Sequence, residues 1–166
     1  MTNHILTAIV IGLAGAAPLA RQQNISNRPT DANAIIAGSK GLYDGTFKSP
    51  GTSSVCGEIP KMASLTGEDT FVIEFSGGEK PGEVTSITFG SKDLVRGATT
   101  SSLFSLNITV VTSNGGRPYA YKLHTDEKKP GESGTATLVQ KGKATTLTVR
   151  GQNDMKETIT LIVTCG

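Results

Sequence analysis

Cys56 and Cys165 are the two cysteines of this 166-residue chain, and their chemistry depends on where the protein folds. They lie 109 positions apart, which rules out a local metal-binding knuckle. In an exported protein two cysteines form one disulfide by default, whereas in a cytosolic protein they would remain buried free thiols. A disulfide here would close a loop of about 100 residues, which stabilises a fold by up to about 4–5 kcal/mol.

His124 is the candidate for acid–base catalysis, because removal of an N-terminal signal would leave no other histidine. It lies at the end region of the predicted strand 118–125, beside Thr125, Asp126 and Glu127. A triad could be assembled from His124, Asp126 and a serine, but no nucleophile-elbow sequence accompanies it. We therefore predict no catalytic residue, and a hydrolase that uses His124 or acidic residues is the third hypothesis.

Acidic pairs are the next candidates for chemistry. They are Glu68–Asp69, Asp126–Glu127, and Asp154 with Glu157. None has the ligand spacing of a calcium loop, and a single histidine cannot build a zinc site. The glycine-containing loops lack the spacing of a phosphate-binding loop. The sequence thus predicts no metal and no cofactor, while a glycosidase-like pair of carboxylates stays open because spatial separation cannot be read from a sequence.

The composition favours an all-β domain. Hydrophobic residues make up 36% and aromatic residues 5% of the chain, with 20 glycines and no tryptophan. This predicts a modest core of Val, Ile and Leu, and threonine is conspicuous from Thr99 onward. The net charge of +2, without a Lys/Arg block among aromatic residues, argues against nucleic acid as a partner.

Short β-rich runs alternate with turn-formers from Gly41 to the C-terminus. The predicted strands are 41–47, 53–59, 70–75, 83–90, 101–112, 118–125, 134–140, 143–149 and 157–165. In the last of these, Ile159, Leu161, Val163 and Cys165 share one phase, which turns Cys165 toward the core. The pattern predicts an antiparallel β-sandwich or partly open barrel of about nine short strands.

An apolar stretch at residues 5–17 predicts an export signal that is too short to span a bilayer. Cleavage is expected after Ala16, with Ala20 as the second choice. One feature argues against an export signal, because the first four residues, "MTNH", include no Lys or Arg. The alternative is an uncleaved apolar tail that packs on the domain or enters a membrane. The predicted organisation is an export signal (1–16), a polar flexible linker (17–39) and a β-domain (40–166), with "NAIIAG" as an alternative first strand or helical turn.

Several segments together resemble the mycobacterial nineteen-kilodalton lipoprotein antigen family. They are "SSVCGE", "GEVTSITFG", "GTATLVQKGKATTLTVRG" and "ETITLIVTCG", and the similarity spans roughly residues 50–166, with 91–130 poorly matched. The resemblance implies an export signal, a polar linker and a β-rich domain whose paired cysteines correspond to Cys56 and Cys165. The family offers no established catalytic residues to transfer.

The segment Leu13, Ala14, Gly15, Ala16 is similar to a bacterial lipobox, with Ala16 where the acylated cysteine would stand. Without that thiol no thioether-linked lipid can form. The chain is then a secreted relative, a form whose cysteine was replaced, or simply a protein with an ordinary signal peptide.

The export signal, the linker and the absence of reactive constellations favour an exported envelope or surface protein without enzymatic activity, which resembles a lipoprotein antigen. Its expected role is structural, adhesive or in host interaction, with host or envelope components as partners. The alternative is a carrier of an apolar ligand such as a lipid, for which small core residues such as Ala136 and Ala144 would leave room. The sequence leaves the oligomeric state open.

Overall fold

The computed structural model describes residues 28–39, 43–61, 67–96, 98–113, 116–127 and 129–166. Within them the chain is mostly strand, and ten strands join one antiparallel sheet, so the predicted all-β class is confirmed. The strands are β1 (Arg28–Ala37), β2 (Gly45–Ile59), β3 (Thr70–Ser76), β4 (Val84–Ser91), β5 (Thr100–Ser101), β6 (Ser105–Val111), β7 (Pro118–His124), β8 (Ser133–Lys141), β9 (Ala144–Gln152) and β10 (Thr158–Cys165). Two short 3-10 helices are η1 (Asp93–Arg96) and η2 (Thr125–Glu127).

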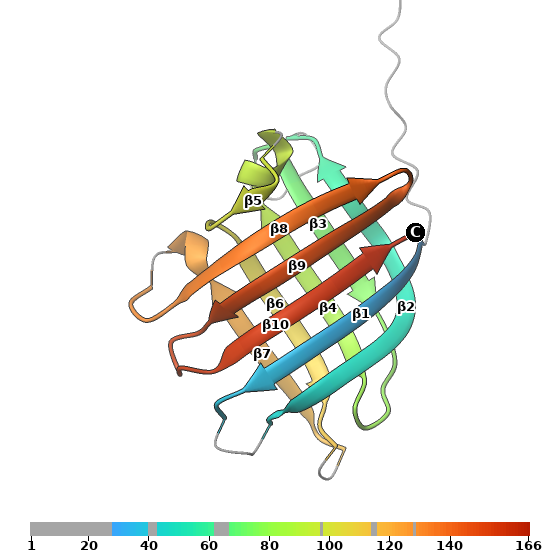
Figure 1. Cartoon of the computed structure of the whole chain (residues 1–166), viewed down its shortest axis with the longest axis vertical. Coiled ribbons are helices and arrows are strands. Elements are labelled where there is room, and N and C mark those ends of the chain that lie inside the picture. The colour runs from blue at the N-terminus through green and yellow to red at the C-terminus, as the bar shows by residue number, and fades with distance from the viewer. Residues whose placement is uncertain (1–27, 40–42, 62–66, 97, 114–115, 128) are drawn as a thin grey trace, which may run out of the picture.

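The sheet curls into a half-barrel whose two layers cross each other in Figure 1. Its strand order is β5-β8-β9-β10-β1-β2-β3-β4-β6-β7. The front layer consists of β8, β9, β10, β1 and the first half of β2, and the back layer of the second half of β2 with β3, β4, β6 and β7. The long strand β2 joins the layers, because it pairs with β1 up to Ser53 and with β3 from Thr52, with a bulge between Ser53 and Val55. A bulge bends a strand, which lets one strand belong to both layers.

Strand β1 lies inside the sheet, so the predicted linker over 17–39 and the domain start at residue 40 are wrong for residues 28–37. It pairs along its length with β10 on one side and β2 on the other. Thr30, Ala32, Ala34 and Ile36 point into the core, which is the period-two pattern of a strand. Part of this strand, "NAIIAG", was predicted only as an alternative first strand or helical turn, because small and hydroxylated residues carry little hydrophobic signal. Residues 1–27, with the predicted export signal, lie outside the described residues.

The other strands follow the sequence prediction with two differences. Residues 45–47 of the predicted strand 41–47 and all of the predicted strand 53–59 belong to the single strand β2, which continues through "SPGTS" without a turn, and residues 41–42 lie outside the described residues. The predicted strand 101–112 contains β6, preceded by the two-residue β5, which pairs with β8. Together with β1 these differences give ten strands among the described residues, where about nine were expected.

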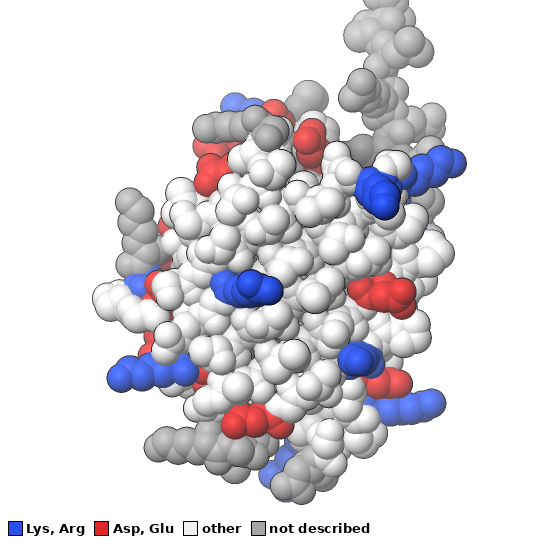
Figure 2. Space-filling model, in the orientation of Figure 1, with Lys and Arg blue, Asp and Glu red and all other residues white. Residues whose placement is uncertain are grey.

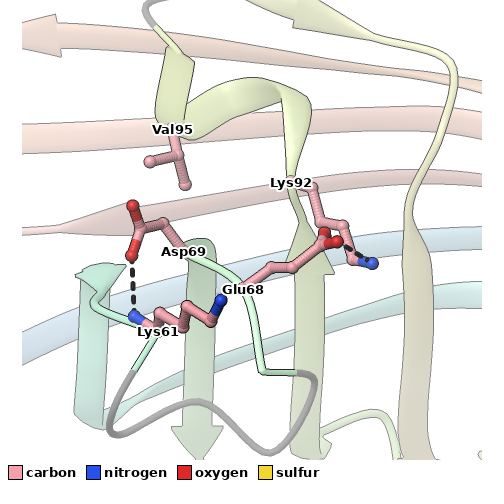
Figure 3. Close-up of a pocket in the computed structure, with 5 residues that line it drawn as sticks. All are labelled: Lys61, Glu68, Asp69, Lys92 and Val95. Atoms are coloured by element: carbon pink, nitrogen blue, oxygen red, sulfur yellow. Dashed lines mark hydrogen bonds and ion pairs between the residues drawn. The ribbon is translucent and has the colours of Figure 1, made fainter.

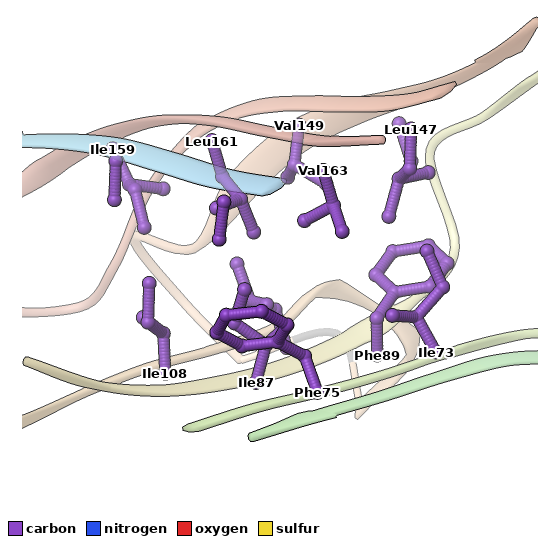
Figure 4. Packing of buried hydrophobic residues seen from close by; sticks show 14 of the residues in the cluster. Ile73, Phe75, Ile87, Phe89, Ile108, Leu147, Val149, Ile159, Leu161 and Val163 are labelled. Atoms are coloured by element: carbon purple, nitrogen blue, oxygen red, sulfur yellow. The ribbon is translucent and has the colours of Figure 1, made fainter. Parts of the chain in front are cut away.

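The core lies between the two layers, as Figure 4 shows. Its labelled residues come from the front layer (Leu147, Val149, Ile159, Leu161 and Val163) and the back layer (Ile73, Phe75, Ile87, Phe89 and Ile108). The inward phase predicted for the last strand is confirmed, because its alternate residues are at most 2% exposed. Burial of these apolar side chains on both layers is the main source of stability for such a sheet.

Candidate functional site

The disulfide predicted between Cys56 and Cys165 is present. The two Cα atoms lie 6.6 Å apart, within the range that disulfides occupy. Cys165, at the end of β10, is fully buried, and Cys56, on β2, is half-buried. The bond therefore ties two strands that both neighbour β1 but do not pair with each other. Its position in the packed interior fits a structural bond, because reactive cysteines are usually accessible.

His124 lies at the end of β7 with both ring nitrogens engaged. Its Nε2 is 3.2 Å from Asn107 Oδ1, and its Nδ1 is 3.4 Å from Glu127 Oε1. The carboxylate beside the ring is thus Glu127, and not Asp126 as the triad would require. A general base needs a free ring nitrogen that reaches the nucleophile's proton. In this arrangement neither nitrogen is free, so the geometry is that of a histidine bridging a strand to the following turn.

The acidic pair Glu68–Asp69 lines a surface pocket of about 260 Å³ with Lys61, Lys92 and Val95 (Figure 3). Lys92 Nζ forms an ion pair of 2.8 Å with Glu68 Oε2, and the backbone N–H of Lys61 donates to Asp69 Oδ1 at 2.7 Å. Both side chains of the ion pair are about half exposed, where such pairs contribute little. These contacts bind the two carboxylates to different partners, Glu68 to the Lys92 side chain and Asp69 to the Lys61 backbone.

Glu157 forms a buried polar cluster that sequence reasoning missed. The sequence pairs it with Asp154, but the structure separates their environments: Glu157 is 6% exposed, whereas Asp154 is exposed. Its Oε2 accepts hydrogen bonds from Tyr119 Oη at 2.5 Å and Asn153 Nδ2 at 2.8 Å. The backbone carbonyl of Glu157 accepts a bond from Tyr121 Oη at 3.0 Å. Two tyrosines spaced two residues apart on β7 thus reach the start of β10, and the alternation in "PYAYKLH" was the available signal.

The same cluster raises the pKa of both tyrosines above the ordinary value. For Tyr119 the largest cause is burial, followed by its hydrogen bond to the Glu157 carboxylate. For Tyr121 the largest cause is again burial, followed by the negative charge of Glu157. Tyr43 stacks on Tyr119 with ring centroids 3.9 Å apart and nearly parallel planes. The neutral phenols are therefore held as hydrogen-bond donors that link β7 to Glu157, the residue before β10.

The two layers approach each other closely where glycines face the core. A Cβ atom on Gly151 of β9 would overlap Leu123 Cδ2 of β7, and one on Gly134 of β8 would lie 2.9 Å from Phe104 Cζ. Neither position has room for a methyl group. This packing lends no support to the hypothesis that a lipid lies between the layers, since such a site needs an underfilled core.

The front layer carries a broad, regular outer face. Strand alternation and burial place fifteen side chains on it, in three cross-strand rows. From β8 to β2 the rows are Val139–Thr146–Thr164–Asp31–Pro50, Thr137–Thr148–Ile162–Asn33–Lys48, and Thr135–Arg150–Thr160–Ile35–Thr46. We call this set the threonine face. Seven of its fifteen members are threonine, and charged side chains on the face are few and separate (Figure 2).

Several members of the threonine face are large apolar side chains that are exposed to solvent. Val139 is 56%, Ile35 is 47% and Ile162 is 39% exposed. Next to Ile162 in its row, the Oδ1 atom of Asn33 is buried and has no hydrogen-bond partner among the described residues. The alternation of threonines in the last strands was visible in the sequence. Its continuation across five strands depends on β1, which the sequence prediction had left outside the sheet.

Among the described residues no group of three or more His, Cys, Asp or Glu side chains is placed to hold a metal ion. Within those ranges, no helix combines the length and the apolar character that crossing a membrane requires.

No protein family model, no curated protein and no solved structure matches this chain. The resemblance to the lipoprotein antigen family therefore remains a prediction.

Proposed function

We propose that this chain is an exported cell-envelope or surface protein without enzymatic activity, which acts by presenting its threonine face to other macromolecules. The observation that carries the proposal is that face: five adjacent strands offer mostly short, uncharged side chains over a continuous surface, with Asp31, Lys48 and Arg150 as the charged exceptions. Side chains such as threonine lose little conformational entropy on binding, and they offer both a methyl group and a hydroxyl group. Exposed apolar residues within a polar surround are typical of interaction surfaces.

The disulfide supports the export half of this proposal. Disulfides form and persist in oxidising compartments outside the cytoplasm, and the bond between Cys56 and Cys165 is built into the interior of the fold. The predicted signal at residues 1–16 supplies the route. In the family that the sequence resembles, the protein is held at the membrane by a lipid, which Ala16 cannot carry.

Export is tested with the full chain, carrying a C-terminal epitope, in a bacterial host. We expect the protein in the envelope or culture fraction, with neither cysteine alkylated under denaturing, non-reducing conditions. The variant Ala16→Cys should shift the protein to the membrane fraction and incorporate labelled palmitate. A chain that stays in the cytoplasm with both thiols free would contradict the proposal.

The contact role is tested by binding of the exported protein to intact cells and envelope preparations. The double variant Thr137→Lys/Thr148→Lys places two charges on the threonine face and should reduce binding about tenfold or more, because buried unpaired charge is costly. Thr88→Lys, on the exposed side of β4 in the back layer, is the matched control and should bind normally. Equal binding by all three proteins, or a hydrolytic turnover abolished by His124→Ala, would overturn the proposal.

A further inference from the structure

We infer that the threonine face binds a second copy of this chain, about a twofold axis that passes through Ile162. The inference rests on the proposed function, because it names the partner that the same face would contact. The evidence for it is the position of two charged side chains of the threonine face, Arg150 and Asp31, relative to Ile162 at the centre of the face.

Arg150 and Asp31 lie on opposite sides of Ile162. Arg150 is on β9, in the row of Thr160, and Asp31 is on β1, in the row of Thr164. Since Ile162 sits on β10 between those rows, it occupies the midpoint of the line that joins the two charges. Two strand spacings and four residues of rise put the Cα atoms of Arg150 and Asp31 about 17 Å apart. Neither side chain forms a salt bridge with another described residue.

This arrangement is self-complementary. In a twofold dimer every contact occurs twice, with one residue touching its counterpart and the counterpart touching it in return. An axis that lies in the interface, passes through Ile162 and crosses the Arg150–Asp31 line at a right angle brings Arg150 over the second copy's Asp31. The reciprocal ion pair forms on the other side, and Ile162 packs against the second copy's Ile162. Two ion pairs thus flank an apolar centre.

The remaining distinctive residues find partners under the same operation. The aliphatic stem of Lys48 comes to lie over the second copy's Ile35, which is 47% exposed in the single chain. Asn33 comes near the second copy's Thr160, so that two polar side chains lie opposite each other beside the apolar centre. The exposed apolar side chain of Ile35 is therefore covered in the same dimer that pairs Arg150 with Asp31.

The area of the threonine face indicates how strongly two copies of the chain would associate. Five strands and three rows cover about 500 Å² on each copy, or about 1,000 Å² for the pair. Interfaces of this size are weak and transient rather than permanent. We therefore expect a reversible dimer that forms in the micromolar range or above, a concentration that proteins confined to an envelope surface reach locally.

The test is sedimentation equilibrium over a concentration series, with the full chain purified from whichever cell fraction contains it and oxidised so that the disulfide is formed, and with all variants in that same form. Wild type should move from monomer toward dimer as concentration rises. Arg150→Asp and Asp31→Arg should each place like charges opposite one another and raise the dissociation constant about tenfold or more. An equimolar mixture of these two variants should regain association, because each supplies the charge that the other lacks. Lys122→Asp, an equal charge change at an exposed position of β7, should behave as wild type.

The possible results distinguish a failure of the twofold contact from a failure of the proposed function. Wild type that stays monomeric at every concentration, single variants that associate normally, or a mixture that fails to recover would each overturn the twofold contact. Circular dichroism and protection of both cysteines verify that the variants are folded. If wild type is monomeric while Thr137→Lys/Thr148→Lys still abolishes binding to cells, the face contacts another partner and only the self-association is wrong. If the dimer forms as expected but the chain remains cytoplasmic, the proposed function fails and the dimer stands.

Discussion

Tyr119 donates a hydrogen bond of 2.5 Å to the buried carboxylate of Glu157, and this bond connects the outermost strand of the back layer to the residue that precedes β10. Asn153 holds the same carboxylate oxygen, and Tyr121 binds the carbonyl of Glu157. Strand β10 is therefore anchored at both ends, by the polar cluster at its start and by the disulfide at Cys165. Between these two anchors, the inward side chains of β10 are apolar and buried. The polar cluster and the disulfide therefore hold opposite ends of one strand that packs in the core.

Replacement of Glu157 should show how much the polar cluster stabilises the fold. Glu157→Ala leaves the Tyr119 hydroxyl and the Asn153 amide without an acceptor, and we expect a loss of about 2–3 kcal/mol in the free energy of unfolding. Glu157→Gln retains an acceptor of the same shape and should lose only about 1 kcal/mol. Urea unfolding at pH 7 measures both. Equal stability of wild type and Glu157→Ala would mean that water replaces the carboxylate at no cost.

The raised pKa values of Tyr119 and Tyr121 predict a loss of stability in alkali. Their unfolded-state pKa is about 10, and the folded state binds both protons more tightly. The contribution is therefore fully present below about pH 10 and is lost as the pH rises through the folded-state values. Urea midpoints measured from pH 8 upward should fall above about pH 10 in wild type, and fall less steeply in Tyr119→Phe/Tyr121→Phe. Parallel curves for the two proteins would assign the alkaline loss to other groups.

Removal of the disulfide should destabilise the domain without changing its fold. The double variant Cys56→Ala/Cys165→Ala should lose at most about 4–5 kcal/mol, because its unfolded state is no longer constrained across the loop of about 100 residues. Thermal unfolding of this variant and of reduced wild type should agree. An unchanged melting temperature would show that the bond does not constrain the unfolded chain.

Truncation should locate the true start of the domain. A chain that begins at residue 39 lacks β1, which has hydrogen-bonded neighbours on both sides, and should not unfold cooperatively. A chain that begins at Arg28 keeps every described strand and should melt near the temperature of the longer protein. Cooperative melting of the shorter chain at the same temperature would show that β10 and β2 can close the sheet without β1.

A methyl group at Gly151 should be poorly tolerated. Gly151→Ala would place its Cβ against Leu123, and the layers must separate to admit it, at a cost of about 1–3 kcal/mol. Gly90→Ala is the matched control, because it lies in a strand with its nearest neighbour at the ordinary contact distance of 3.5 Å. Comparable melting temperatures for the two variants would mean that the layers are less closely packed than these contacts indicate.

The sequence by itself determined most of the strands and the direction in which their side chains point. Alternation in "TFVIEF" and "TITLIVTC" is enough to bury Ile73 or Leu161, because a strand has only two faces and water decides between them. Cysteine count and spacing were likewise enough to pair Cys56 with Cys165 once export was assumed. In "TDANAI", which belongs to β1, the alternation between hydrophobic and polar residues is weak. The same reasoning therefore assigned this central strand to a linker.

Only the tertiary structure decided which strands are neighbours and which side chains meet across them. Arg150 and Asp31 are 119 residues apart in the sequence and acquire a common centre at Ile162 because β1 inserts between β10 and β2. Tyr119 and Glu157 meet because the sheet curls until β7, at one end of the strand order, faces the start of β10. The order of strands and the curl of the sheet minimise the exposed apolar area of the whole chain, and that sum cannot be read from any local pattern.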